Sequence, residues 1–157
     1  SISMVSGTFG KAFGSGGAFL ASNEKIGEML IQSSSPFRYT TALSPSLAAG
    51  ALKSLQKIKK NQYLGTDLLK ISKIWKKEIE NIGKYEVMGD AHILSLIIGD
   101  EDKTMMMQKF LEDKGFLAVG IRPPTVPAGK SRIRLTIRSS FNANILKKFI
   151  SVLKAYK

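Results

Sequence analysis

The second half of the chain carries the clearest patterns of apolar and polar residues. Residues 132–138 (RIRLTIR) alternate strictly, and residues 93–98 (ILSLII) form a short run of branched apolar side chains. Both patterns are typical of strands with a buried face. Gly115 is expected to end the helix before it, and residues 116–121 are predicted to form one more strand. Residues 122–130 contain three prolines and are not expected to form a strand interior.

Apolar residues at helical spacing predict five helices. These cover roughly residues 24–31, 45–58, 64–82, 100–114 and 145–156. Asn23 is expected to cap the first helix, and Ser44 followed by Pro45 is typical of the start of the second. From residue 93 onward, the order strand, helix, strand, loop, strand, helix predicts a small α/β layer domain.

The first part of the chain is dominated by two unusual loops. Residues 7–17 (GTFGKAFGSGG) hold five glycines in eleven residues, which excludes a stable helix or a regular strand. They predict a shaped loop between short strands at residues 1–6 and 18–21. Residues 33–46 (SSSPFRYTTALSPS) predict a second loop, rich in hydroxyl groups.

Composition and charge limit the classes of function. The 157 residues amount to one domain or a piece of a larger one, and 43% apolar with 23% charged residues excludes wholesale disorder. Lysine and arginine outnumber aspartate and glutamate by 24 to 12, which gives a net charge of +12. This balance requires an acidic partner or a missing acidic portion of the same molecule. Nucleic acid is not expected, because the basic faces lack interleaved aromatic residues.

Several kinds of site are excluded by missing residue types. The chain has no cysteine, so a disulfide, a thiolate zinc site and a cysteine nucleophile are excluded. His92 is the only histidine and is expected to be an ordinary loop residue. No apolar run approaches the roughly 18 residues of a membrane span. The first residues lack the basic head and apolar body of a signal peptide.

Lys11 is the most notable candidate for chemistry. The nucleotide P-loop pattern fails, because Val5 stands where the first glycine should be and Ala12 follows the lysine. The dinucleotide pattern fails as well, because Phe19 replaces its last glycine. A lysine that forms a Schiff base needs a pocket shaped by close backbone approach, which the flanking glycines permit. Together with the hydroxyl of Thr8, Lys11 is compatible with pyridoxal phosphate; the alternative is a solvated surface lysine.

Other polar positions have two interpretations each. Arg122 precedes two prolines, and we expect an extended, stiff segment that orients its guanidinium toward a carboxylate. The alternative is an exposed loop arginine. Thr40 and Thr41 are either phosphate donors or a cluster of hydroxyls at a helix entry. Arg132 and Arg134 share one face of a strand and are interpreted as structural charges.

Three motifs in one order carry a resemblance to a known family. They are residues 7–19 (GTFGKAFGSGGAF), 37–52 (FRYTTALSPSLAAGAL) and 121–137 (IRPPTVPAGKSRIRLTI). Together they resemble the α-oxoamine synthases, pyridoxal-phosphate enzymes of the aspartate-aminotransferase fold, fold type I. The resemblance implies that the chain is the C-terminal part of a longer enzyme. Residues 1–60 would end the large cofactor domain, and residues 61–157 would form a small α/β domain with a short, mainly antiparallel sheet.

The resemblance also implies roles for individual residues. Lys11 matches the Schiff-base lysine of the family, and Thr8 matches its phosphate-binding threonine. Thr40 and Thr41 match a segment that reaches the cofactor phosphate of the other subunit in a homodimer. Arg122 matches the arginine that holds the carboxylate of the amino acid. These roles belong to the resemblance and not to the spacing of the residues.

The expected function follows from the same family. The segment at residues 121–127 favours the member that acts in biotin synthesis, which joins L-alanine to pimeloyl-CoA or the carrier-protein thioester and releases carbon dioxide. Thr125 would line the path of the acyl substrate. A cytoplasmic enzyme with no metal and no membrane partner is expected, inactive as this piece alone. The alternatives are another family member, using glycine or a different acyl-CoA, and a non-enzymatic basic module that binds an anionic partner.

Overall fold

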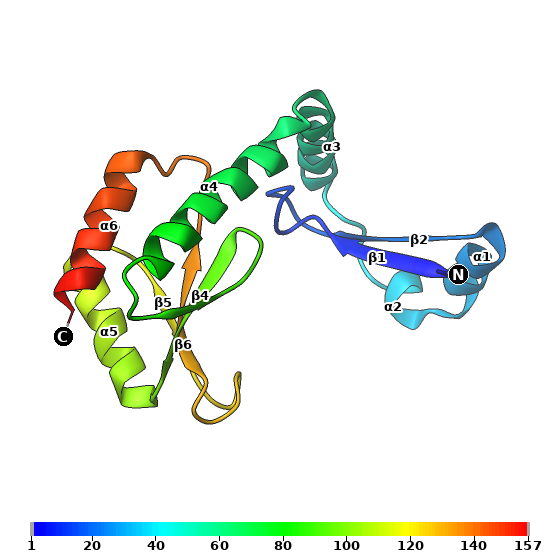
Figure 1. Cartoon of the computed structure of the whole chain (residues 1–157). Coiled ribbons are helices and arrows are strands. Elements are labelled where there is room, and N and C mark those ends of the chain that lie inside the picture. The colour runs from blue at the N-terminus through cyan, green and yellow to red at the C-terminus, as the bar shows by residue number, and fades with distance from the viewer. Residues whose placement is uncertain (1, 157) are drawn as a thin grey trace. The chain divides into compact units, whose positions relative to one another are not determined.

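The chain divides into two compact units, Ser1–Gln62 and Tyr63–Lys157, whose elements are drawn in Figure 1. The computed structural model describes residues 2–156. The start of the strand predicted at residues 1–6 and the last residue of the predicted 61–157 domain therefore lie outside the described residues. The assignment of residues 1–60 and 61–157 to two parts of a larger enzyme stays a prediction.

The first unit consists of a two-stranded antiparallel sheet and three helices. Strands β1 (Met4–Thr8) and β2 (Ala18–Ser22) pair so that Thr8 lies opposite Ala18. Helices α1 (Glu24–Ser33), α2 (Ser35–Arg38) and α3 (Pro45–Lys60) follow. The loop predicted between two short strands is present and joins them into a β-hairpin, but its predicted bounds of 7–17 are wrong at the start, because Gly7 and Thr8 pair with β2.

Local signals explain most of these boundaries. The side chain of Asn23 accepts a hydrogen bond from the backbone N–H of Ile26 at 3.0 Å, which confirms the predicted cap. Helix α3 begins at Pro45 as predicted, although the hydroxyl of Ser44 bonds to that of Ser46 at 2.8 Å and does not cap the helix. The continuous loop predicted at residues 33–46 is wrong in one part, because α2 forms there with a proline in its first turn.

The second unit contains a four-stranded antiparallel sheet. Its strands are β3 (Glu86–Met88), β4 (Ile93–Gly99), β5 (Val119–Ile121) and β6 (Ser131–Thr136). Their spatial order is β3-β4-β6-β5, with the two longest strands in the centre. The short, mainly antiparallel sheet expected for a small α/β domain is therefore present.

Three helices complete this unit and supply the other half of its core. They are α4 (Tyr63–Glu80), α5 (Glu101–Asp113) and α6 (Ala143–Ala155), seen beside the sheet in Figure 1. Alternate residues of the central strands and one stripe of each helix are buried together. The core includes Trp75, Ile79, Leu94, Leu96, Met107, Leu111, Ile133, Leu135, Phe149 and Leu153. Burial also raises the pKa of Tyr85, whose hydroxyl donates to the backbone oxygen of Leu153 at 3.3 Å.

Two strand predictions need correction. The strand predicted at 116–121 is shorter, because the N–H of Phe116 donates to the oxygen of Leu111 at 2.9 Å and continues the exit of α5. Gly115, with φ of 84°, makes this exit possible. Strand β3 was not predicted, since only Val87 of its three residues is buried and no alternation is visible.

The two units differ sharply in burial. Within the described residues of the first unit, Ala51 is the only buried hydrophobic residue. Large apolar side chains such as Phe37 (66% exposed) and Tyr39 (77% exposed) lie open. A two-stranded hairpin is marginal on its own, and apolar surface of this extent is typical of a contact surface. Within residues 2–156, no helix has both the length and the hydropathy that crossing a membrane requires.

Two isoleucines of α4 test the position of the core. Ile79 is fully buried and Ile74 is 55% exposed. Ile79→Ala should lower the free energy of unfolding by about 2–5 kcal/mol, because it leaves a cavity. Ile74→Ala should change it by less than about 0.5 kcal/mol. Urea unfolding followed by circular dichroism measures both, and equal losses would contradict the packing described here.

Candidate functional site

The loop between β1 and β2 holds Lys11 at its tip. The N–H of Phe9 donates to the oxygen of Gly17, and the N–H of Ser15 donates to the oxygen of Phe9, both at 2.9 Å. A further bond from the N–H of Gly14 to the oxygen of Lys11, also 2.9 Å, closes a tight turn. Gly14 has φ of 58°, which side chains rarely adopt. The backbone therefore fixes where the lysine leaves the loop.

Thr8 stabilises the neck of this loop. Its hydroxyl donates to the backbone oxygen of Gly17 at 3.3 Å and accepts from the N–H of Gly10 at 3.1 Å. Thr8 and Lys11 are thus brought together in one hydrogen-bonded loop. The hydroxyl is engaged within the loop here, so binding a phosphate would require its proton to turn away from Gly17.

Glycines allow the loop to pack closely against α3 and the segment before it. A Cβ atom on Gly17 would lie 2.8 Å from Cδ2 of Leu43, and one on Gly16 would lie 3.0 Å from Cδ1 of Leu47. The hydroxyl of Ser15 also donates to the oxygen of Leu47 at 2.6 Å. Residues 15–17 are therefore small because Leu43 and Leu47 approach the loop backbone closely.

Thr40 and Thr41 lie on the segment that this packing holds against the glycine loop. Both lie between α2 and α3, and the contact of Leu43 with Gly17 holds the end of this segment against the glycine loop. Both threonines are exposed, and neither hydroxyl has a hydrogen-bond partner among residues 2–156. The structure thus places the segment of Thr40 and Thr41 beside the glycine loop of the same chain, while the roles of both threonines stay predictions.

Lys11 itself is exposed, and its amine has no hydrogen bond or ion pair within the described part of the chain. The free amine of Lys11 and the hydroxyl of Thr8 in the same loop fit pyridoxal phosphate, which needs an amine for its aldehyde and donors for its phosphate. The described residues contain no group of three or more histidine, aspartate and glutamate residues suited to a metal ion.

Arg122 and Thr125 belong to the second unit, directly after β5. The N–H of Thr125 donates to the oxygen of Arg122 at 3.1 Å, so these residues form a turn, with a cis peptide bond between Pro123 and Pro124. The extended segment predicted here is therefore wrong. Arg122 is exposed, as either interpretation of it requires. That Arg122 and Thr125 act together with Lys11 remains a prediction.

Arg132 and Arg134, both interpreted as structural charges, differ in their hydrogen bonds. Arg132 donates through Nε to the oxygen of Lys130 at 3.0 Å. Arg134, opposite Val119 in the sheet, is exposed and has no carboxylate partner among the described residues. Strand alternation places Arg134 on the sheet face away from the core. Arg134 is therefore a second free guanidinium, which the alternating pattern alone did not reveal.

Comparison with known proteins agrees with this geometry. Residues 2–153 match the family "Aminotransferase class I and II". An 8-amino-7-oxononanoate synthase of Pseudomonas syringae pv. syringae is 36% identical over 88% of this chain and 35% of its own length. One from Pseudomonas fluorescens is 33% identical over 97% of this chain and 39% of its own length.

Solved structures share the fold. A serine palmitoyltransferase from S. paucimobilis with a bound PLP–myriocin aldimine has a TM-score of 0.86 and 25% identity, over 98% of this chain and 39% of that one. The 8-amino-7-oxononanoate synthase of Francisella tularensis has a TM-score of 0.83 and 21% identity, over 97% of this chain and 44% of that one.

The chain belongs to the aminotransferase class I and II family, whose fold it shares. More narrowly, it falls among the α-oxoamine synthases, which use pyridoxal phosphate. The chain spans little more than a third of the length of the curated relatives it matches. The activity of the whole protein is therefore a matter for proposal.

Thr8 offers a test of the loop that does not depend on activity. Thr8→Val keeps the shape of the side chain but removes the acceptor for Gly10 and the donor for Gly17. Amide hydrogen exchange at Gly10 should then be roughly two- to tenfold faster, since one hydrogen bond contributes about 0.5–1.5 kcal/mol. Thr8→Ser keeps the hydroxyl and should exchange at the original rate. Unchanged exchange in Thr8→Val would remove Thr8 from the neck of the loop.

Proposed function

We propose that this chain is the C-terminal part of an 8-amino-7-oxononanoate synthase. The enzyme would condense L-alanine with pimeloyl-CoA, or the corresponding carrier-protein thioester, and release carbon dioxide. The observation that carries the proposal is Lys11, an unpaired amine at the tip of a backbone-fixed glycine loop. The curated relatives with this name support the choice of substrate.

Lys11 would have two tasks in this reaction. Its amine would be the covalent attachment point of pyridoxal phosphate while no amino acid is bound. Once the amino acid has taken its place, the freed amine would remove the proton from Cα of L-alanine as a general base. Bound pyridoxal phosphate would supply the electron sink that accepts the resulting negative charge. The turn from Lys11 to Gly14 limits the positions from which the amine can act.

The hydroxyl of Thr8 would orient the cofactor held by Lys11 through its phosphate, and Thr40 and Thr41 would contact the phosphate of a second cofactor. Thr8 lies three residues from Lys11, and the other two lie on the segment that Leu43 fixes against the loop. In the homodimer expected from the family, Thr40 and Thr41 would serve the phosphate of the other subunit. The exposed apolar surface of the first unit fits a chain that is covered by further polypeptide of the same enzyme.

Arg122 would hold the carboxylate of L-alanine, because a guanidinium binds a carboxylate through two parallel hydrogen bonds. Thr125, in the same turn, would line the path of the acyl substrate. Arg134 competes for the carboxylate role, since it is also exposed and free of carboxylate partners in the described residues. The two arginines can be separated by experiment.

Another α-oxoamine synthase is the second candidate. The similarity to serine palmitoyltransferase structures, with a TM-score of 0.86 and 25% identity, favours an enzyme of this group with a different amino acid or acyl thioester. A panel of L-alanine, L-serine and glycine with acyl thioesters of different length distinguishes the two. A non-enzymatic basic module, suggested by the net charge of +12, would form no covalent adduct with the cofactor.

Lys11→Ala tests the attachment point. In the longer enzyme, reduction with borohydride after addition of pyridoxal phosphate should fix one cofactor on Lys11, as intact mass and peptide mapping would record. Lys11→Ala should lose the adduct and the activity, whereas Lys25→Ala, an exposed lysine on α1, should keep both. A specific adduct in Lys11→Ala would refute the assignment.

Arg122→Ala and Arg134→Ala form a matched pair. Loss of the carboxylate contact should raise the KM for L-alanine by about tenfold to hundredfold, equivalent to about 1.5–3 kcal/mol. The KM for the acyl thioester should change much less. We expect this pattern for Arg122→Ala; finding it only for Arg134→Ala would move the carboxylate contact to β6.

A further inference from the structure

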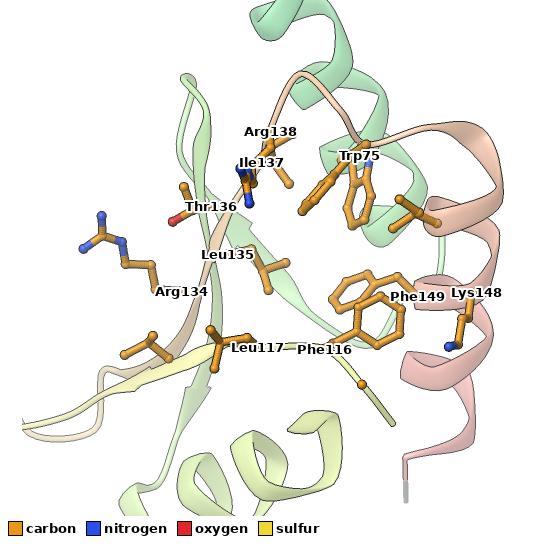
Figure 2. A pocket seen from close by; sticks show the side chains of 15 residues that line it. Trp75, Phe116, Leu117, Arg134, Leu135, Thr136, Ile137, Arg138, Lys148 and Phe149 are labelled. Atoms are coloured by element: carbon orange, nitrogen blue, oxygen red, sulfur yellow. The ribbon is translucent and has the colours of Figure 1, made fainter. Parts of the chain in front are cut away.

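The second unit contains a pocket of about 560 Å³, and of the residues considered under the proposed function only Arg134, the competitor of Arg122, lines it. It is bounded by residues 115–119, by the end of β6 with the residues after it, and by α6 (Figure 2). Its volume lies within the range of about 300–1,000 Å³ that is usual for small-molecule sites. None of Lys11, Thr8, Thr40, Thr41, Arg122 and Thr125 lines it.

Four aromatic rings form the inner wall of the pocket. Trp75 lies 5.3 Å from Phe141 and 5.3 Å from Phe149, and Phe149 lies 5.1 Å from Phe116, measured between ring centroids. Trp75 and Phe149 are almost fully buried, so the core holds them in place. The wall is thus formed before any ligand arrives, which lowers the entropy lost on binding.

The pocket exists because β5 is short. Pairing between β5 and β6 begins at Val119 opposite Arg134, and residues 116–118 leave the sheet. The bond from the N–H of Phe116 to Leu111 holds this segment at the end of α5. β6 beyond Arg134 therefore has only β4 as a strand neighbour. Leu117, one of the lining residues of the pocket, is left 91% exposed.

The charges around the pocket have one sign. Arg134, Arg138 and Lys148 are among its lining residues, and no aspartate or glutamate is. The ammonium of Lys148 lies 5.6 Å from the ring centre of Phe116. Arg138 is exposed and forms no ion pair within residues 2–156. An apolar interior with a cationic rim is complementary to a molecule that has an apolar body and an anionic end.

We propose that this pocket binds a medium-chain fatty carboxylate. The aliphatic chain lies against the half-buried rings of Phe116 and Phe141, behind which Trp75 and Phe149 are packed, and the carboxylate lies toward Lys148, beside Phe116. The inference does not rest on the proposed function, because it uses neither the cofactor nor Lys11. It can therefore fail or succeed independently of the synthase assignment.

Trp75 makes the proposal measurable, because it is the only tryptophan of the 157-residue chain. The probe is ω-bromoundecanoate, whose terminal bromine quenches tryptophan fluorescence at short range and would lie beside Phe141, next to Trp75. At concentrations below its critical micelle concentration, the probe should quench the fluorescence of Trp75, and the quenching should reach saturation. Undecanoate without bromine should reverse the quenching, and the neutral undecanol should do so much more weakly. Absence of quenching, or equal competition by undecanol, overturns the proposal.

Two substitutions at the exposed Leu117 separate charge from loss of apolar surface. Leu117→Glu and Leu117→Lys remove the same side chain and, at 91% exposure, should both leave the fold intact, as circular dichroism checks. Leu117→Glu should lower the affinity for the probe by about tenfold, because the new carboxylate repels that of the probe at short range. Leu117→Lys should lower the affinity only by the amount that loss of the leucine side chain causes. Equal affinities in the two variants overturn the proposal. So does a lack of Trp75 quenching in the longer enzyme, which would mean that other polypeptide fills the pocket.

Discussion

The pairing of β4 with β6 is the constraint on which the second unit depends. Leu94, Leu96, Ile133 and Leu135 point to the helices only in the observed register, where Leu96 lies opposite Ile133. A slip by one residue would turn every side chain of a strand to the other face and bring Arg134 into the core. The arginines on the open face, the turn after β5 and the aromatic pocket all take their positions from this one register.

The first unit is organised by a different kind of interaction. With Ala51 as the only buried hydrophobic residue described there, its glycine loop takes its shape from hydrogen bonds and from close approach of Gly16 and Gly17 to leucine side chains. Hydrogen bonds fix geometry but add little net stability in water. A precisely shaped loop on a weakly buried support is what an element needs when its stability comes from contacts elsewhere in a larger protein.

Sequence reasoning succeeded where the signal is local. Asn23 and Pro45 mark helix starts, and Gly115 marks a helix end, because each acts through its own backbone or its nearest neighbours. It failed where tertiary contacts decide. Strand β3 exists because β4 pairs with it, and β5 is short because α5 retains Phe116. Two features could not be predicted: that Arg134 has no carboxylate partner among the described residues, and that four aromatic rings form the wall of a pocket. Both depend on which residues become neighbours in space.

The charge of the chain links these observations to the ligands proposed for it. In residues 2–156 the ion pairs are Lys70–Asp67, Lys76–Asp90 and Lys109–Asp113, so most of the excess of cations is not neutralised internally. The proposed ligands, which are phosphate, the carboxylate of an amino acid, a thioester of coenzyme A and a fatty carboxylate, are all anions, and a positive surface favours the approach of each of them. Charge would therefore favour anions in general but would not select which anion binds at which site. That choice must come from shape: a loop that presents one amine at Lys11, a turn that presents one guanidinium at Arg122, and a wall of rings around Trp75 that accepts an apolar body.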